Sequence, residues 1–257
     1  MSRYNIENTI TLRVRDRIIM KIGILHIHGM GSDKKDIHKK IISNIAKTLQ
    51  NTNNIELEIE PVLYYEEMQK NQKDLLKRMG NIGLGTIRKW IINDLGDVAT
   101  LGSDEGTSNR VNRIIDNSIN KLKLKIGDNG KIVVIAQSLG CQVFSSYLNK
   151  RLKEGKTFPE IKLFFTTGCN IPIFISGMKK DDIKHFPPPS DGFKWINFWS
   201  KTDYLSYPLK SINIAYGEYV EDVRVRFWGL PFKVHTRYNQ HKKVYRRISS
   251  EIKKLAL

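Results

Sequence analysis

The chain has 257 residues, of which 40% are hydrophobic and 9% are aromatic. This composition excludes a disordered or fibrous chain and leaves room for one α/β domain with a large core, or for two small domains. Its 43 Lys and Arg residues against 26 Asp and Glu residues give a net charge of +17. Such a charge favours an anionic partner, but Lys, Asn and Ile are abundant throughout, so the charge alone does not identify a substrate.

Cysteine content and hydropathy indicate neither a disulfide framework nor a targeting segment. Cys141 and Cys169 have no metal-binding spacing, and we expect both to pack as small apolar groups. The apolar run at residues 18–27 is interrupted by Lys21 and Gly23 and lacks the cleavage site of a signal peptide. No run is long enough to span a membrane. We therefore expect a cytoplasmic location, with signal-independent secretion left open.

From residue 20 onward, short apolar strands alternate with amphipathic helices. Residues 1–19 precede them as an N-terminal extension, whose alternating pattern predicts an edge strand or hairpin. The predicted strands cover residues 20–27, 55–65, 132–135, 161–167 and 195–199, with 220–227 as a further strand or an arm. The predicted helices cover residues 37–49, 66–79, 84–98, 111–122, 143–152 and 242–255.

This alternation predicts a single α/β domain over residues 1–257, with a mostly parallel central sheet and helices on both faces. No repeat and no low-complexity linker divides the chain. Residues 170–193 include three consecutive prolines and are expected to form an irregular excursion near the site. Apolar stretches at 82–101 and 171–178 could wall or cover a site, although ordinary core packing would use the same residues.

The segment Lys131–Gln142 carries the clearest functional pattern in the sequence. A buried strand leads into a turn with Ser138 at its tip and then into a helix, and the small residues Ala136 and Gly140 flank the serine. This pattern lifts a serine hydroxyl above the carboxyl edge of a parallel sheet. A serine at such a point is also often a helix N-cap, so a nucleophile requires partners elsewhere in the chain.

A serine nucleophile needs a base to take its proton and an acid to orient that base, and in this arrangement both follow the serine in the chain. His235 lies in a predicted loop just before the terminal helix and is the favoured base. His241 falls at a solvated helix start, and His185 precedes the proline run. Both are less suitable positions for the base.

The acid is expected at the carboxyl end of a strand that follows the serine. Asp203 meets this requirement because it comes shortly after the predicted strand at 195–199. Taken singly, Asp203 reads as an ordinary turn residue, and its place in the ordered set with Ser138 and His235 favours the functional interpretation. The competing carboxylates are Asp222, Asp181, Asp182 and Asp191.

A developing oxyanion needs two N–H donors about 3 Å from the charge. The backbone N–H of Leu139, directly after the serine, can supply one donor. The loop at residues 28–31 follows the first strand, and its glycines allow the N–H groups of Gly29 and Met30 to turn inward. We therefore predict an oxyanion hole formed by Leu139, Gly29 and Met30.

These motifs together resemble the α/β-hydrolase superfamily, in its lipase- and esterase-like serine hydrolases, over about residues 20–250. His28-Gly29-Met30-Gly31 matches the HG-x-G oxyanion loop of the family, and Ala136-Gln137-Ser138-Leu139-Gly140 resembles its A-H-S-L-G elbow. Residues 195–203 resemble its acid-bearing strand, and residues 235–238 its H-x-x-Y histidine loop. The chain departs from the family by having Ala136 where glycine is commoner and Gln137 where histidine is frequent.

The resemblance implies a carboxylic ester hydrolase that works without a cofactor or a metal. In such an enzyme Ser138 attacks an acyl carbonyl to form an acyl-enzyme, His235 acts as base and then acid, and Asp203 holds the imidazole. Lipid acyl esters are one implied substrate class, and an anionic membrane surface is a further expected partner. Nucleic acid is not expected as a partner, and the oligomeric state is not predicted.

Two other functions stay open at this point. His26 and His28 have the H-x-H spacing with which two imidazoles on one strand reach a single metal, as in metal-dependent amidohydrolases. Such enzymes also need His and Asp ligands from other strands, and a longer barrel. The second alternative is a catalytically inactive basic module that binds anionic lipid or nucleic acid through the helix at 242–255. No nucleic-acid-binding motif is visible in the sequence.

Overall fold

The computed structural model of the chain describes residues 19–29, 37–50, 52, 54–64, 105–179, 183, 187–212, 214–229 and 231–256. Strands and helices alternate along these residues. In chain order they are β1 (Met20–Ile27), α1 (Ile37–Leu49), β2 (Ile55–Val62), α4 (Glu105–Ile126), β3 (Lys131–Gln137), α5 (Leu139–Lys153), β4 (Ile161–Thr167), α6 (Ile171–Ile175), β5 (Lys194–Trp199), α7 (Ile214–Tyr219), β6 (Val220–Arg224), α8 (Pro231–His235), the 3-10 helix η2 (Tyr238–Gln240) and α9 (Lys242–Leu255).

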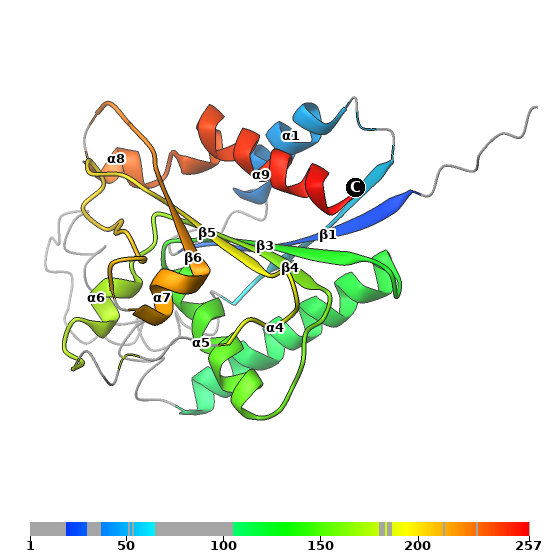
Figure 1. The fold of residues 1–257 in the computed structure, drawn as a ribbon, viewed down its shortest axis with the longest axis horizontal. Coiled ribbons are helices and arrows are strands. Elements are labelled where there is room, and N and C mark those ends of the chain that lie inside the picture. Colours follow the sequence, from blue (N-terminus) through cyan, green and yellow to red (C-terminus); the bar gives the residue numbers. More distant parts are fainter. Residues whose placement is uncertain are drawn as a thin grey trace, which may run out of the picture.

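The strands form a six-stranded sheet in the order β2-β1-β3-β4-β5-β6, in which every neighbouring pair is parallel (Figure 1). The chain passes from β1 outward to β2 and then crosses back to β3, so the direction of winding reverses between β1 and β3. Open α/β sheets form their ligand sites at this switch point, outside the carboxyl ends of the strands. The predicted mostly parallel α/β fold is confirmed.

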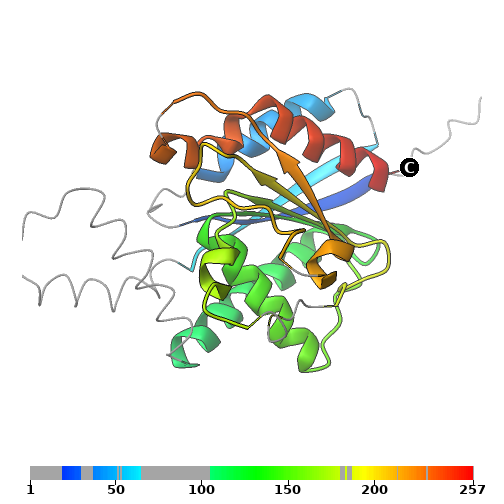
Figure 2. The same cartoon turned by 60° about the vertical axis from the view of Figure 1, so that its left-hand side comes forward.

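Helices cover both faces of the sheet. Helices α1 and α9 lie on one face, and α4 and α5 lie on the other (Figures 1 and 2). Alternate side chains of the strands fill two separate cores: Val133 and Ile135 of β3 pack on the α1/α9 side, and Ile132 and Val134 pack on the α4/α5 side. Burying such a side chain contributes about 1.5–3 kcal/mol, which explains why the strands are apolar on both faces.

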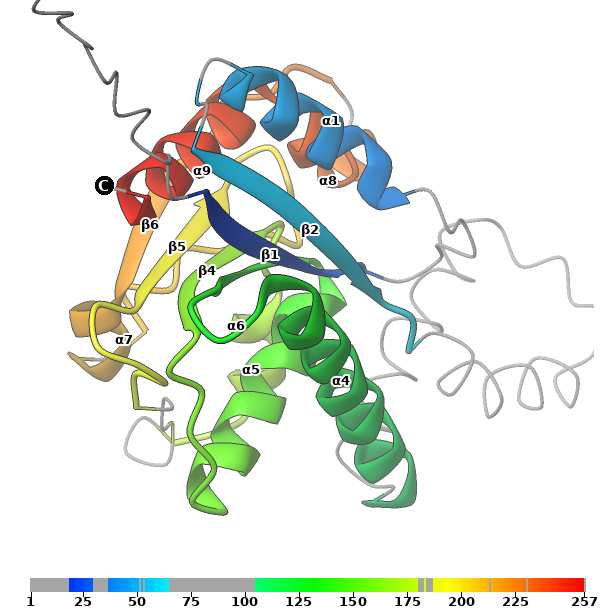
Figure 3. The ribbon, with the colours of Figure 1, turned by 90° about the vertical axis from the view of Figure 1, so that its right-hand side faces the viewer.

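The carboxyl ends of the strands lie at the left of Figure 1, where α6 and α8 follow β4 and β6. Figure 3 views the molecule from the opposite end, with the α1/α9 layer above the sheet and the α4/α5 layer below it. The three residues proposed from the sequence as nucleophile, acid and base all follow strands or loops that reach this carboxyl end. The fold thus positions one site at one end of the molecule.

Some elements have the predicted bounds and others differ. Strand β1 and helix α9 have the predicted bounds. Residues 220–224 form the edge strand β6 rather than an arm. The excursion at 170–193 contains the helix α6, and α7 is not among the predicted elements. These two helices have five and six residues, too few to show a helical repeat in the sequence.

Several predictions fall on residues outside the described part of the chain. They concern the helices at 66–79 and 84–98 and all but the last residue of the N-terminal extension. Among the helices that the structure describes, none combines the length and the apolar character needed to cross a bilayer. The single-domain organisation and the cytoplasmic location stay predictions.

Candidate active site

Ser138 occupies the turn between β3 and α5 in a strained conformation, with φ 52° and ψ −124°. It is the one non-glycine residue with a positive φ among the described residues. Two backbone bonds hold the turn: Ser138 N donates to Thr167 O over 3.0 Å, and Cys141 N donates to Ser138 O over 2.9 Å. The Ser138 side chain makes no capping bond to α5, so this serine is not a simple N-cap and its hydroxyl is available to another partner.

Glycines bring the end of β1 against this turn. A Cβ atom on Gly140 would lie 2.5 Å from the carbonyl oxygen of Ile27, and one on Gly29 would lie 2.7 Å from Cβ of Ser138. Both distances are shorter than real Cβ contacts, so the close approach requires glycine at both positions. The backbone of the loop after β1 therefore lies directly beside the serine.

His235 links Ser138 to Asp203 through hydrogen bonds on both ring nitrogens. Its Nε2 lies 2.8 Å from Ser138 Oγ, and its Nδ1 lies 2.9 Å and 3.1 Å from Asp203 Oδ2 and Oδ1. All three residues are buried. Because a carboxylate only accepts hydrogen bonds, Nδ1 carries the imidazole proton and Nε2 can accept from the serine hydroxyl. The structure thus brings together the three side chains, although His235 ends the short helix α8 rather than lying in a loop.

Gln137, the residue before the serine, ties the histidine segment to the elbow. Its Nε2 donates to the carbonyl oxygen of His235 over 3.3 Å, and its Oε1 accepts from Asn239 Nδ2 over 2.9 Å. Gln137 and Asn239 are both buried. The position where the sequence departs from the family pattern therefore carries a bridge between β3 and the residues that follow α8. The sequence analysis did not identify Asn239. The one signal in the sequence was the unusual residue Gln137, because a buried glutamine needs a hydrogen-bond partner.

Asp203, the acid predicted from the sequence, lies in a tight turn after β5. Asp203 N donates to Ser200 O over 3.2 Å, and Leu205 N donates to Asp203 Oδ1 over 3.1 Å. Tyr238 closes the turn from below, because its hydroxyl donates to Ser206 Oγ over 3.0 Å. Burial and the negative charge of Asp203 both raise the pKa of Tyr238, so its hydroxyl stays protonated at neutral pH.

Of the competing acids that the structure describes, Asp222 bonds to groups other than His235. Asp222 accepts from the backbone N–H groups of Leu209 and Lys210 and from Asn197 Nδ2 over 2.7 Å, so its carboxylate is occupied in holding the loop before α7. Asp191 is exposed. Asp181 and Asp182 lie outside the described residues.

His241, the other candidate histidine that the structure describes, has a structural position at the start of α9. His241 caps α9, where its ring accepts from Lys243 N over 3.2 Å and packs edge-on against Phe227. Partial burial lowers the pKa of His241, and the nearby cations Lys243 and Arg237 lower it further. His185 lies outside the described residues.

The predicted oxyanion donors are described in part. Leu139 is the first residue of α5, and its N–H is among those that the helix itself cannot bond. Gly29 lies against Ser138, and its carbonyl oxygen is 2.6 Å from Nδ1 of His28. The His28 ring also stacks on Tyr64, with ring centroids 5.1 Å apart. Met30 lies outside the described residues.

The H-x-H pair does not gather a third ligand among the residues that the structure describes, where no cluster of three His, Cys, Asp or Glu side chains could hold a metal ion. His26 is fully buried in the sheet, and neither of its ring nitrogens has a hydrogen-bond partner within the described structure. Burial, with a contribution from His28 and His38, lowers the pKa of His26 to about 3, so its ring is neutral.

No family model matches the chain, and no curated protein matches it in sequence. Its fold is similar to that of one of two fungal esterases from Rhizomucor miehei, with 12% identity and a TM-score of 0.52, over 93% of this chain and 76% of that one. It is also similar to a hyperthermophilic esterase from the archaeon Pyrobaculum calidifontis, with 13% identity and a TM-score of 0.46, over 94% of this chain and 79% of that one. A Xanthomonas campestris protein of the alpha/beta superfamily of hydrolases has 14% identity and a TM-score of 0.45, over 90% of this chain and 99% of that one. The likeness to the Rhizomucor miehei esterase shows that the two proteins share an α/β fold.

Proposed function

We propose that this protein is a serine hydrolase that cleaves carboxylic esters through a covalent acyl-enzyme. The observation that carries the proposal is the unbroken hydrogen-bond chain from Ser138 Oγ to His235 Nε2, and from His235 Nδ1 to Asp203. The strained turn at Ser138 supports it, because a serine held at positive φ without a capping role points to a constraint other than helix stability. In this proposal Ser138 is the nucleophile, His235 the base and Asp203 the acid.

The proposed reaction has two halves. Ser138 Oγ attacks the acyl carbon while its proton passes to His235 Nε2, and the carbonyl oxygen becomes an oxyanion. The oxyanion collapses, the bond to the alcohol breaks, and His235 returns the proton to the departing oxygen. Water then attacks the acyl carbon and gives a proton to His235 Nε2. The bond between the acyl carbon and Ser138 Oγ breaks, His235 returns the proton to Ser138 Oγ, and the carboxylic acid leaves. Asp203 stays ionised and stabilises the imidazolium in both halves.

The oxyanion would be met by the N–H groups of Leu139 and of the loop after β1, with Gly29 and Met30 as the proposed donors. The position of Leu139 at the start of α5 supports this role, since the positive end of the helix dipole favours negative charge there. No step requires a cofactor.

Esters are the first substrate class to test. The Rhizomucor miehei protein of similar fold is an esterase, and the triad chemistry suits an alcohol leaving group. Within this class we favour hydrophobic acyl esters of lipids, with an anionic membrane surface as the partner. Cytoplasmic action is part of the same proposal.

The experiment is labelling with a fluorophosphonate probe, followed by hydrolysis of p-nitrophenyl esters of increasing acyl length. We expect wild-type protein to be labelled and to turn over, and Ser138→Ala to lose the label completely and at least about 10³-fold of the activity. Addition of a chelator should change neither result.

Ser249→Ala is the matched control, because Ser249 is a buried serine on α9 whose hydroxyl donates to Tyr245 O. It should keep both label and activity. Folded wild-type protein that takes no label and hydrolyses no ester would overturn the proposal, as would a label that survives in Ser138→Ala.

A further inference from the structure

Two aromatic side chains project into solvent beside the candidate active site. Trp228, in the segment between β6 and α8, is 91% exposed, and Tyr204, next to Asp203, is 68% exposed. The neighbouring aromatic residues Tyr238 and Phe227 are buried in the core. Trp228 and Tyr204 therefore lie outside a core that other aromatic residues of the same segments enter. Large exposed aromatic side chains near a site mark a surface that meets an apolar partner.

These residues belong to two adjoining segments, 200–207 and 225–243, which we call the catalytic rim. Thr202 Oγ1 donates to Phe227 O over 3.5 Å, and Arg237 Nη1 donates to Trp228 O over 3.2 Å, so the segments are held together. The rim contains six cations and a single carboxylate, Asp203, which is buried against His235. All six cations are exposed: Lys201, Arg226, Lys233, Arg237, Lys242 and Lys243.

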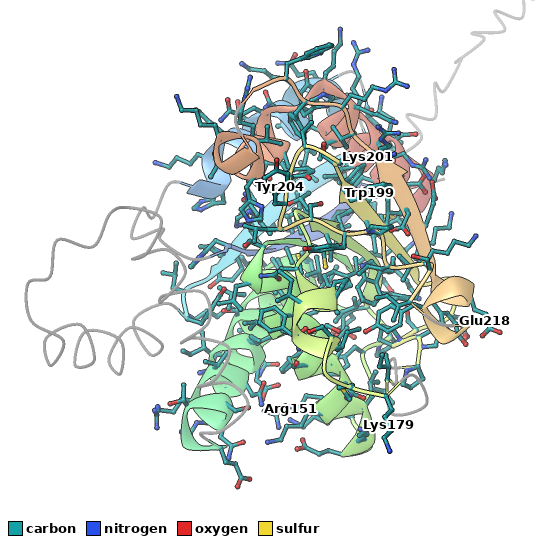
Figure 4. The ribbon with its side chains drawn as sticks, turned by 90° about the vertical axis from the view of Figure 1, so that its left-hand side faces the viewer. Arg151, Lys179, Trp199, Lys201, Tyr204 and Glu218 are labelled. Carbon is teal, nitrogen blue, oxygen red and sulfur yellow. The ribbon has the colours of Figure 1, made fainter. Side chains whose placement is uncertain are left out.

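The charge at the opposite end of the molecule is arranged differently. There Lys121 and Lys125 of α4 pair with Glu60, and Lys123 pairs with Glu160 over 3.0 Å. Those cations are balanced by carboxylates, whereas no carboxylate of the rim is exposed. Figure 4 looks onto the catalytic end, with Tyr204 and Lys201 both in its upper half. The cations of the rim therefore have no exposed carboxylate within the rim to balance them, unlike those at the end of α4.

We propose that the catalytic rim docks on an anionic phospholipid bilayer, with Trp228 and Tyr204 among the lipid head groups and the six cations facing phosphates. Trp and Tyr are the residues that favour the membrane–water interface, and each cation near an anionic surface strengthens binding about fivefold. The serine then opens toward the bilayer, and its ester substrate is a lipid of that bilayer. The identity of the substrate and the preference for lipid over nucleic acid rest on the proposed hydrolase function, whereas the exposed aromatic residues and cations of the rim do not.

Single-stranded nucleic acid also binds to exposed aromatic residues among cations. The surroundings of the rim favour lipid, because the aromatic side chains border a site suited to acyl esters. A lipid ester lies at the depth of the head groups, within reach of a site that faces the membrane. A nucleic-acid backbone offers phosphodiesters, on which the proposed acyl chemistry has no carbonyl carbon to attack.

The test is co-sedimentation with vesicles of phosphatidylcholine alone and of phosphatidylcholine with 30% phosphatidylglycerol. All proteins carry Ser138→Ala, so that hydrolysis does not change the vesicles. We expect binding to the anionic vesicles, little binding to the neutral ones, and a loss of bound protein at high salt. Trp228→Ala should weaken binding about tenfold, and Lys201→Glu with Lys233→Glu by more than tenfold.

Matched controls come from the far end of the molecule. Leu124 of α4 is 87% exposed, so Leu124→Ala removes a comparable apolar group away from the rim. Lys121→Glu with Lys153→Glu changes the net charge as much as the rim variant does. Both controls should bind vesicles like the parent, and thermal melting should show that every variant is folded.

The proposal is overturned if rim and control variants lose binding equally, if neutral vesicles bind as well as anionic ones, or if single-stranded RNA competes the protein off the vesicles. Hydrolysis of a soluble short-chain ester by the protein with Ser138 intact tests the proposed function separately. Vesicle binding without ester hydrolysis would therefore overturn the function and support the docking, and the reverse result would do the opposite.

Discussion

Two carboxylates of this protein are equally buried but differ in their partners. The side chains of Asp203, at the carboxyl end of the sheet, and Glu251, in α9, are each 1% exposed. Asp203 faces an imidazole and a backbone N–H. Glu251 faces three cations: Lys254 at 2.7 Å, Arg247 at 3.0 Å and Lys194 at 3.5 Å.

The difference lies in whether the charge of the partner is fixed. Burial alone would raise the pKa of Glu251, but Lys254, Arg247 and Lys194 together lower it, so the carboxylate stays charged and holds α9 in place. The partner of Asp203 is the imidazole of His235, which can donate from Nδ1 to the carboxylate and accept at Nε2 from the hydroxyl of Ser138. A buried carboxylate with fixed cations is suited to structure, and one with a titratable partner is suited to proton transfer.

The sharpest test of this comparison is Asp203→Asn. The amide can present an N–H to His235 and thereby favour the wrong tautomer, so we expect kcat to fall by about 10³–10⁴-fold, with a change in stability below about 1 kcal/mol. Steady-state kinetics on an ester and thermal melting measure the two effects. Asp222→Asn is the comparison variant: if it abolishes turnover while Asp203→Asn is mild, Asp222 is the acid and the proposed triad is wrong.

Glu251→Gln tests the structural half of the comparison. Loss of the negative charge leaves the three cations without their shared partner, and we expect a loss of about 3 kcal/mol in the free energy of unfolding, with kcat unchanged. Urea denaturation measures the stability. Glu221→Gln is the control, because Glu221 is half-exposed and pairs with a single cation, Arg247, within the described part of the chain, so its loss should cost less than about 1 kcal/mol. Equal losses for the two variants would contradict the assigned role of Glu251.

The helices and strands that position the site can be predicted from the sequence. The contacts between side chains within the site are predicted less well. The apolar runs give the bounds of β1 and α9, and the order of Ser138, Asp203 and His235 suffices to bring them to one end, because parallel strands share a carboxyl edge. The sequence favours Asp203 over Asp222 by its place after a strand, but the contact of Asp203 with His235 depends on the whole fold, which local sequence does not encode. Short helices such as α6 carry too few turns for a periodic signal.

The bridge from Gln137 to Asn239 shows the same limit more clearly. These residues are 102 positions apart, and either amide alone would be expected on the surface. Their pairing follows from the packing of η2 against the end of β3, which depends on the whole fold. The sequence therefore shows that Gln137 differs from the residue that is frequent in the family. The role of Gln137 can be recognised only when the structure shows its partner, Asn239.

His26 is a buried histidine that, unlike His235, has no carboxylate partner within the described structure. Because the folded pKa of His26 is about 3 and an unfolded histidine titrates near 6.5, the unfolded state binds the proton first. Stability is therefore fully present above pH 6.5 and is lost as the pH falls toward 3, by about 2.5 kcal/mol between pH 7 and pH 4.5. Urea denaturation at several pH values should show this slope in wild type and a flatter one in His26→Leu. His241→Gln should flatten the slope less than His26→Leu does, because the ring of His241 is only partly buried whereas that of His26 is fully buried. An unchanged slope in His26→Leu would contradict the assignment.

The smallest expected effect concerns how His235 is held. Gln137→Ala removes the donor to the His235 carbonyl and the acceptor for Asn239, both inside a buried region. The imidazole should then sample positions away from Ser138, so we expect kcat to fall about tenfold with KM little changed. Gln142→Ala is the matched control, since Gln142 lies in α5, the helix that follows β3, and its side chain donates to Ser146 Oγ at the surface. Asn239→Ala should lower kcat by a smaller factor than Gln137→Ala does. The double variant should lose no more kcat than Gln137→Ala alone, because both residues act through one bridge. Additive losses, or a fall in stability without a fall in kcat, would show that the bridge supports the fold and leaves the histidine unaffected.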